Sequence, residues 1–339
     1  MSAQAYLNSI YGYADQFKVG YKGAAAVELS DDYSEVSEVI IAGMGGSSFG
    51  GRILKSAFEK NDLLIPVELL LEYDLPAYAD ENNLVILTSY SGNTEEILSV
   101  LEQACSRGCK LLVISSGGKL GNAIDQDKLP GYVFDTKHNP SGSPRTGTGY
   151  IVGATLSIFN KLKFLNFTQQ DADELVQYMS TFMDLMKKDG KLSQQIADKL
   201  LGRIPILVSS EHLDAATYIW RNFMNETAKS MGFLAEIPCS NHHFLDGLQF
   251  PEDVRKKLLF VYIMSNKYHP QNKKRMKIMR QATKDRGLSD ISITLGSGKP
   301  LHEIWELIII GSLVSYNLAM AHKVDPVTNE MVDYLKSHL

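Results

Sequence analysis

Two short stretches gather hydroxyl groups and glycines where an apolar run gives way to a helical pattern. They are "GMGGSSFGG" at residues 43–51 and "SYSGNT" at residues 89–94. Glycine lets the backbone approach a ligand closely, a helix N-terminus offers free N–H groups to an anion, and hydroxyl groups add donors for phosphate oxygens. The residues that we expect to contact such an anion are Ser47, Ser89, Ser91 and Thr94, with Gly46 beside them.

A second interpretation of "SYSGNT" is an ordinary helix start. Thr94 can act as an N-cap, with Glu95 and Glu96 in the first turn of the helix. The sequence leaves both interpretations open, although a similar turn on a neighbouring strand favours a phosphate site. Neither turn has the full dinucleotide-binding spacing or the lysine of a nucleotide P-loop. These features together indicate a small phosphorylated metabolite.

The elements that must position these turns alternate in type along the first half of the chain. Apolar runs predict strands at 38–46, 65–73, 83–90, 109–118 and 131–136. Helical spacing predicts helices at 47–60 and 94–108 and a long, largely buried helix at 148–165. Short apolar strands that alternate with helices predict a parallel sheet covered on both faces.

The same order of elements returns in the second half, after a charged helical connector at 171–202. The predicted strands are 204–210, 233–238, 256–265 and 289–298, and the predicted helices are 213–232, 271–287 and 304–321. This recurrence indicates an internal duplication of one α/β unit. The second copy has "SNKYHPQNK" where the first has "SYSGNT", so only the first copy keeps a turn of small residues that admits an anion.

Composition limits the classes of partner and compartment. The chain has 339 residues, 44% of them apolar, and a net charge of −5, which argues against nucleic acid as a partner. Three cysteines are too few for a disulfide framework, and we expect packed or partly buried thiols. The N-terminus lacks the basic start and apolar core of a signal peptide, and the polar residues within 304–321 indicate a buried helix and not a membrane span. We therefore expect a cytoplasmic protein that does not act at a membrane.

The two hydroxyl-rich turns on a duplicated α/β unit resemble the sugar isomerase (SIS) fold. Four later motifs narrow the resemblance to the bifunctional phosphoglucose/phosphomannose isomerases: "SPR" (143–145), "NETAK" (225–229), "SNHH" (240–243) and "VDPV…YLK" (324–336). The resemblance covers nearly the whole chain. It implies an α/β protein of two tandem three-layer α-β-α SIS units, each with a mainly parallel sheet. The units expected are 1–165, which binds the phosphate, and 166–339, whose C-terminal tail contributes to the active site.

The resemblance also implies catalytic roles for particular residues. Glu226 is the base that shuttles a proton, Arg145 stabilises an enediolate, and Thr328 lies near carbon 2 of the sugar. The residues implied in ring opening are His242, chosen over His243, and Lys336. Chemistry alone favours other interpretations of three of these residues. Glu226 is then a surface carboxylate near Lys229, Arg145 a surface loop arginine and Lys336 a solvent-exposed tail residue.

The function implied is the interconversion of fructose 6-phosphate with glucose 6-phosphate and mannose 6-phosphate through an enediol. In such enzymes the histidine comes from the partner subunit, which implies a homodimer with shared active sites. We expect no cofactor and no metal, because the chain shows no H-E-x-x-H pattern or clustered His and Asp ligands. Two alternatives stay open: an SIS isomerase for another phosphosugar, and a non-catalytic sugar-phosphate sensor. The missing dinucleotide-binding pattern argues against an oxidoreductase.

Overall fold

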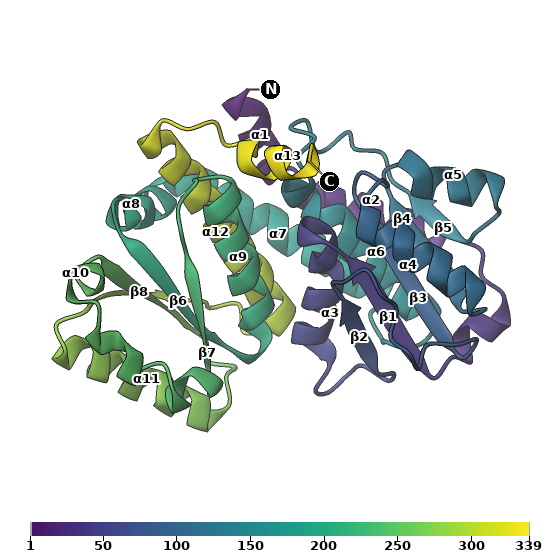
Figure 1. The fold of residues 1–339 in the computed structure, drawn as a ribbon. Helices are drawn as coiled ribbons and strands as arrows, with labels where there is room; N and C mark the ends of the chain where they lie inside the picture. Colours follow the sequence, from purple (N-terminus) through teal and green to yellow (C-terminus); the bar gives the residue numbers. More distant parts are fainter. Residues whose placement is uncertain (1, 339) are drawn as a thin grey trace. The chain divides into compact units, whose positions relative to one another are not determined.

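The computed structural model describes residues 2–338, and within them the strands form two parallel sheets (Figure 1). The chain divides into two compact units. The N-terminal unit, Asn8–Ser180, holds a five-stranded sheet; the C-terminal unit, residues 2–7 and 181–338, holds a four-stranded sheet. The expected α/β class with parallel sheets is confirmed. The division after residue 165 stays a prediction, and the compact units meet within α7 (Gln169–Asp189).

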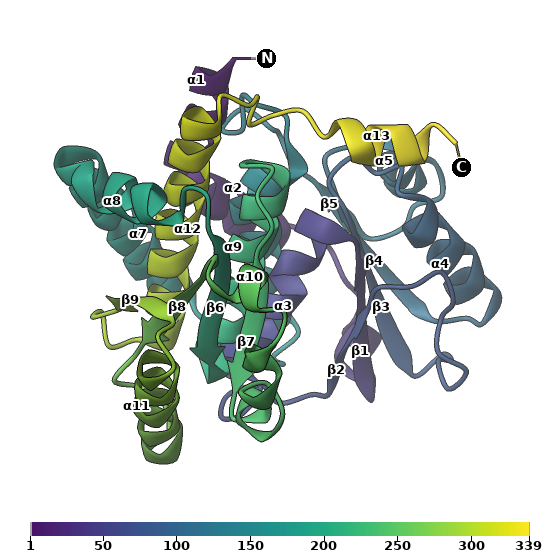
Figure 2. The ribbon, with the colours of Figure 1, turned by 60° about the vertical axis from the view of Figure 1, so that its left-hand side comes forward.

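The N-terminal sheet has the strand order β2-β1-β3-β4-β5. Its strands are β1 (Glu38–Gly43), β2 (Val67–Leu70), β3 (Asn83–Ser89), β4 (Lys110–Ser115) and β5 (Gly131–Val133). The helices of this unit are α2 (Tyr13–Ala25), α3 (Phe49–Phe58), α4 (Glu95–Ser106), α5 (Gly118–Gln126) and α6 (Thr148–Lys161), and α1 (Ala3–Tyr11) precedes them. Helices α4 and α5 lie on one face of the sheet and α3 on the other (Figure 2). Sheet and helices therefore form the expected three layers.

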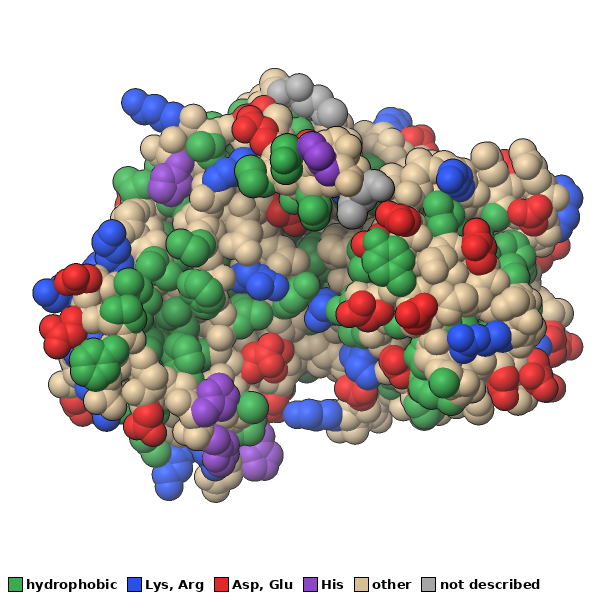
Figure 3. All heavy atoms as spheres, in the orientation of Figure 1, with side chains coloured by type: hydrophobic (Ala, Val, Ile, Leu, Met, Phe, Trp, Pro, Cys, Tyr) green, Lys and Arg blue, Asp and Glu red, His purple; other side chains and the backbone are tan. Residues whose placement is uncertain are grey.

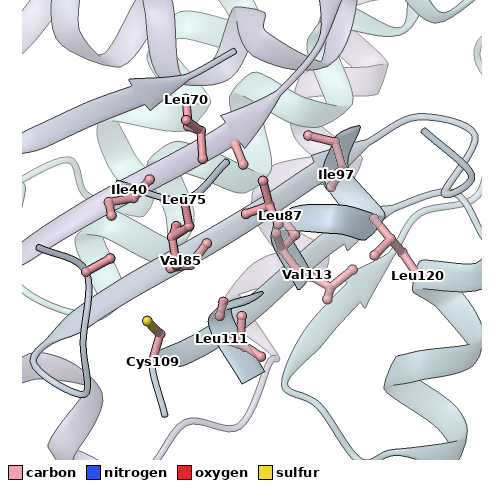
Figure 4. Close-up of a cluster of buried hydrophobic side chains, with 14 residues drawn as sticks. Ile40, Leu70, Leu75, Val85, Leu87, Ile97, Cys109, Leu111, Val113 and Leu120 are labelled. Atoms are coloured by element: carbon pink, nitrogen blue, oxygen red, sulfur yellow. The ribbon is translucent and has the colours of Figure 1, made fainter. Parts of the chain in front are cut away.

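Alternate residues of the N-terminal strands build a core beneath α4 and α5 (Figure 4). Val85 and Leu87 of β3 and Val113 of β4 are fully buried there, because side chains two apart on a strand share a face. Burying each such side chain contributes about 1.5–3 kcal/mol. Cys109 packs into the same cluster, and its burial raises the pKa of the thiol. The other two cysteines are exposed, so the expectation of packed thiols holds only for Cys109.

The C-terminal sheet has the strand order β7-β6-β8-β9. Its strands are β6 (Ile204–Ser210), β7 (Phe233–Ile237), β8 (Leu258–Met264) and β9 (Ser289–Thr294). The helices of this unit are α8 (Lys191–Leu200), α9 (Asp214–Glu226), α10 (Glu252–Arg255), α11 (Pro270–Asp285), α12 (Pro300–His322) and α13 (Glu330–Lys336). In both sheets the second strand lies at the edge, followed by the first, third and fourth. This shared order agrees with the predicted duplication.

Helix α12 is the most apolar segment of the chain. It is long and apolar enough to cross a membrane, and 78% of its most apolar window is buried inside the protein. It packs closely on α9, because a Cβ added to Gly311 would lie 2.5 Å from Cγ of Trp220. The predicted buried helix is therefore confirmed.

Two predicted helical segments differ from the structure. The connector at 171–202 is two helices, α7 and α8, because Gly190 between them adopts a left-handed conformation with φ of +53°. The helix predicted over 213–232 ends at Glu226. There Lys229 turns left-handed, with φ of +51°, and the Ser230 N–H closes the helix onto the Met224 carbonyl at 3.0 Å. Helices α1, α2, α5 and α10 were not predicted.

Charged side chains of both signs are mixed on the one face that Figure 3 draws. On the face drawn in Figure 3, Lys and Arg lie among Asp and Glu. A nucleic-acid-binding surface gathers basic residues on one face or along one helix. The face shown lacks such a basic patch.

Candidate active site

The strand order of the N-terminal sheet reverses direction between β1 and β3. In an open parallel sheet, ligands bind in the crevice at such a reversal, beyond the carboxyl ends of the strands. The turn η2 (Gly45–Ser48) follows β1, and the "SYSGNT" turn follows β3. The two hydroxyl-rich turns therefore lie where this fold binds ligands.

The "SYSGNT" turn curls so that its first and last residues meet. The Oγ of Ser89 lies 2.7 Å from the Oγ1 of Thr94, and it also accepts the Gly92 N–H at 3.1 Å. Thr94 occupies the N-cap position of α4, but its side chain makes no capping hydrogen bond. The cap interpretation therefore fails for its hydroxyl group, which instead pairs with Ser89.

Gly92 makes this curl possible. Its φ is +68°, and a Cβ at this position would lie 1.8 Å from the carbonyl oxygen of Gly117. Only glycine fits a left-handed residue packed this closely against another backbone. Ser91, the residue before it, is exposed, and its Oγ accepts the Asn93 N–H at 3.3 Å.

Ser47 connects the two turns. Its Oγ accepts the backbone N–H of Tyr90 at 2.9 Å, and its carbonyl oxygen lies 2.9 Å from the Oγ1 of Thr88. Ser47 is buried, with 5% of its surface exposed. The prediction that Ser47 approaches from the neighbouring turn agrees with these contacts.

Gly46 brings a third loop to the same place. A Cβ on Gly46 would lie 3.1 Å from the carbonyl oxygen of Pro144 and 3.2 Å from Cα of Arg145. Arg145 lies in η3 (Pro144–Gly147) and only 2% of it is exposed, so it is not the surface arginine of the alternative interpretation. A charged side chain is rarely this buried unless it is paired.

A network of buried polar groups supports the loop that carries Arg145, and sequence analysis did not identify it. The Oγ1 of Thr146 donates to Asn139 Oδ1 at 2.9 Å and lies 2.8 Å from Ser141 Oγ. Asn139 Nδ2 donates to the hydroxyl of Tyr90 at 2.7 Å, and burial raises the pKa of that phenol. The run "NPSGSPRTGT", rich in turn residues, was the signal for this network.

In the C-terminal unit, Glu226 is the last residue of α9 and is half-buried. It lines a cavity of about 790 Å³ between the end of α9 and residues 324–332, within the size range of ligand pockets. Thr328 lines the same cavity, so the structure brings together these two predicted site residues.

Two residues missed by the sequence analysis hold this cavity together. Asn329 Nδ2 donates to Glu226 Oε2 at 3.2 Å. Lys229 Nζ donates to the carbonyl oxygens of Glu226, Asp325 and Thr328, at 2.8, 2.7 and 2.6 Å. In the sequence, Lys229 stands out only as a charge near Glu226 on the same predicted helix. Its partners lie up to 99 residues away, so no local pattern could reveal them.

The remaining two predicted catalytic residues lie elsewhere in this unit. His242 ends η5 (Cys239–His242), Lys336 ends α13, and both are exposed. Neither is among the described residues that line the Glu226 cavity. Their roles in ring opening stay predictions.

The corresponding turns of the C-terminal unit contain different residues. After β6 and β8 lie η4 (Glu211–Leu213) and the segment 265–269. His212 Nε2 lies 2.8 Å from Glu303 Oε2, and Ser265 Oγ donates to the same oxygen at 2.5 Å. The side chain of Tyr268 packs against His212, with ring centroids 5.4 Å apart. Buried side chains of the protein itself therefore occupy this crevice.

Comparison with known proteins identifies the family to which this chain belongs. Residues 190–339 match a family model described as the bacterial phospho-glucose isomerase C-terminal SIS domain. A protein of Caldicellulosiruptor bescii named bifunctional phosphoglucose/phosphomannose isomerase is 30% identical over 98% of each chain. This chain belongs to the bifunctional phosphoglucose/phosphomannose isomerase family.

Two further similarities concern a relative with another name and a solved structure with the same fold. A protein of Sulfolobus acidocaldarius named D-glucosamine-6-phosphate 4-epimerase is 30% identical over 68% of this chain and 70% of its own. The crystal structure of a hypothetical protein from Thermus thermophilus superimposes with a TM-score of 0.75 at 15% identity, covering 97% of this chain and 89% of that one. The predicted phosphoglucose/phosphomannose isomerase resemblance is confirmed.

Proposed function

We propose that the chain is an aldose–ketose isomerase that interconverts fructose 6-phosphate with glucose 6-phosphate and mannose 6-phosphate. The observation that carries the proposal is the Glu226 carboxylate, which lines a ligand-sized cavity and is held by Asn329. Moving a proton between neighbouring carbons requires a base in such a cavity. The near full-length relationship to bifunctional phosphoglucose/phosphomannose isomerases supports this substrate class.

In this proposal Glu226 takes the proton from carbon 2 of the open-chain aldose and returns it to carbon 1. The C2–H bond breaks and a C1–H bond forms, the hydroxyl proton moves from oxygen 2 to oxygen 1, and the carbonyl group thereby moves from carbon 1 to carbon 2 through an enediol(ate). Arg145 stabilises the negative charge of this intermediate through its permanent positive charge. His242 and Lys336 open the sugar ring. Thr328 is small enough to admit both configurations at carbon 2.

The hydroxyl-rich crevice of the N-terminal unit is assigned to the phosphate group. Hydroxyl groups can rotate to present donors to an anion, and the α4 N-terminus adds backbone N–H groups. The residues of this phosphate grip are Ser47, Ser89, Ser91 and Thr94, with the Gly46 backbone beside them. The Ser89–Thr94 pair, which does not cap the helix, supports this assignment.

The test is a coupled assay of fructose 6-phosphate conversion to glucose 6-phosphate in the presence of a chelator, with mannose 6-phosphate assayed in parallel. We expect turnover of both. Glu226→Gln should lower kcat by roughly 10³-fold or more while phosphosugar binding persists, because proton transfer by a side chain contributes about 10²–10⁴-fold. Absence of turnover by the unmodified chain would reject the function, and an active Glu226→Gln variant would reject the base.

We also propose a cytoplasmic homodimer in which the partner subunit supplies His242 to each site. The exposed position of His242 agrees with a role in the site of a neighbouring subunit. The three free cysteines agree with the reducing conditions of the cytoplasm. Mixing Glu226→Gln with His242→Ala chains should restore up to about a quarter of the activity, because a mixed dimer regains one intact site. A mixture as inactive as its components, with exchange of subunits verified, would contradict a shared site.

A second candidate is epimerisation of an amino-sugar phosphate at carbon 4. It is favoured by the Sulfolobus acidocaldarius relative named D-glucosamine-6-phosphate 4-epimerase. The match covers 70% of that protein, against 98% for the isomerase relative. Incubation with glucosamine 6-phosphate followed by NMR separates the candidates, since only the epimerase inverts carbon 4.

A further inference from the structure

We propose that Lys229 and Asn329 are positioning residues for Glu226. Lys229 fastens residues 325–328 to the end of α9, and Asn329 fixes the orientation of the Glu226 carboxylate. The inference rests on the proposed function, because it gives these residues a task in the proton transfer assigned to Glu226.

The ammonium group of Lys229 bridges two distant parts of the chain. Its three donors match three carbonyl acceptors, one on α9 and two in the C-terminal segment, at 2.6–2.8 Å. Lys229 lies three residues past the end of α9, and its left-handed backbone, with φ of +51°, is one that L-residues rarely adopt. The lysine therefore acts as a clamp between the helix end and residues 325–328.

The clamp determines where Asn329 lies. Asn329 follows the clamped carbonyl of Thr328, and its amide donates to one oxygen of the half-buried Glu226 carboxylate. A hydrogen bond to one oxygen restricts rotation of the carboxylate about its last bond. A base that transfers a proton between adjacent carbons must keep its orientation to both, and a misplacement of about 1 Å can cost roughly 10²-fold in rate.

The same clamp holds Thr328, which the proposed function assigns to the carbon-2 side of the sugar. The Thr328 carbonyl accepts from Lys229, and Thr328 and Glu226 line one cavity. Loosening the clamp should therefore disturb both the base, Glu226, and the carbon-2 contact, Thr328. The residues of the phosphate grip should stay in place. The expected kinetic signature is a loss in kcat with little change in KM.

The first experiment compares Lys229→Met with Lys273→Met in the full-length protein. Lys273 Nζ also donates to a carbonyl of this unit, that of Asn266 at 3.0 Å, and it is a matched control. Lys229→Met should speed hydrogen–deuterium exchange at Val327 and Asp333, whose amides bond within residues 325–333. It should also lower kcat roughly 10- to 100-fold with KM within about threefold. Exchange and kcat unchanged from the control would overturn the clamp.

The second experiment compares Asn329→Leu and Asn329→Asp with Asn317→Leu. Asn317 Nδ2 donates to Ser193 Oγ at 3.1 Å in the same unit and is the control. Both Asn329 variants lose the amide donor to Glu226, so the carboxylate loses its fixed orientation. Each should lower kcat roughly 10- to 100-fold with KM within about threefold, and the Asn317→Leu control should keep its kcat. A kcat equal to that of the control, or a loss confined to KM, would overturn the role of Asn329.

The two proposals can fail separately. If the unmodified protein does not isomerise hexose phosphates, the proposed function is wrong, while the exchange measurement still decides whether Lys229 clamps the segment. If the unmodified protein is active but the Lys229 and Asn329 variants match their controls, only the positioning inference is wrong.

Discussion

The two units share a strand order, but the crevices between their first and third strands contain opposite chemistry. In the N-terminal unit the crevice is bordered by serines, a threonine and glycines, and two hydroxyl groups meet 2.7 Å apart. In the C-terminal unit the same place holds Glu303, which is 1% exposed and lies beside His212 and Ser265. A carboxylate repels a phosphate, whereas hydroxyl groups can donate to it.

The difference shows how two copies of one fold can take different functional roles. Filling one crevice with a histidine, a glutamate and a tyrosine removes the space for a ligand and satisfies the buried polar groups. The Tyr268 hydroxyl accepts the Ser210 N–H at 3.3 Å, and burial raises the pKa of this phenol well above its ordinary value. In the proposed function, the C-terminal unit contributes instead through the cavity at the far end of α9, which Glu226 lines.

The largest effect on KM should come from placing a carboxylate in the N-terminal crevice, as Glu303 does in the C-terminal one. Ser91 is exposed, so Ser91→Asp should fold, and its carboxylate should repel the phosphate. Two charges about 4 Å apart interact by about 4 kcal/mol at an effective dielectric constant of 20. We expect KM for fructose 6-phosphate to rise roughly 10²- to 10³-fold in steady-state assays.

The matched control for this change is Asn266→Asp. Asn266 is exposed in the turn of the C-terminal unit that corresponds to "SYSGNT". Its KM should stay within about twofold of the unmodified protein, because only one crevice binds phosphate in this account. An equal rise in both variants would show that the effect comes from net charge.

A smaller effect should come from removing one hydroxyl group of the grip. Thr94→Val keeps the shape of the side chain but loses the contact with Ser89. Losing one hydrogen bond to a charged group costs about 1.5–3 kcal/mol, so KM should rise about 10- to 100-fold. Because the Thr94 hydroxyl does not cap α4, urea unfolding should show a loss below about 0.5 kcal/mol. A loss near 1 kcal/mol with KM unchanged would restore the cap interpretation.

The smallest kinetic effect should follow Glu303→Gln, which alters the filled crevice. Weakening its buried contacts with His212 and Ser265 should lower the free energy of unfolding by about 1–3 kcal/mol, measured by urea unfolding. Both kcat and KM should stay unchanged. A large rise in KM with stability intact would show that the second crevice binds substrate, and the comparison would be wrong.

Sequence patterns predicted most of the fold because each strand is a short apolar run and each repeat keeps the same order. The predictions failed where the backbone conformation of a single residue, and not the apolar pattern, determines where a helix ends. Helix α9 ends at Glu226, and Lys229 three residues later has a left-handed conformation usually adopted by glycine, which an apolar pattern cannot reveal. The left-handed Gly190 splits the connector for a comparable reason.

For the candidate site, local spacing identified the turns but not their long-range contacts. Ser89 and Thr94 are five residues apart, so a curled turn could be predicted to join them. Asn329 and Glu226 are 103 residues apart, and only tertiary structure shows that they meet. The burial of Arg145 likewise depends on neighbours that its own loop does not specify.

The most direct test of the central claim is calorimetric titration of fructose 6-phosphate into the Glu226→Gln protein, which should bind without turnover. This account predicts one bound molecule per chain, affinity at least 10²-fold weaker after adding Ser91→Asp, and unchanged affinity after adding Asn266→Asp. Two bound molecules per chain, or binding lost with Asn266→Asp and kept with Ser91→Asp, would contradict it.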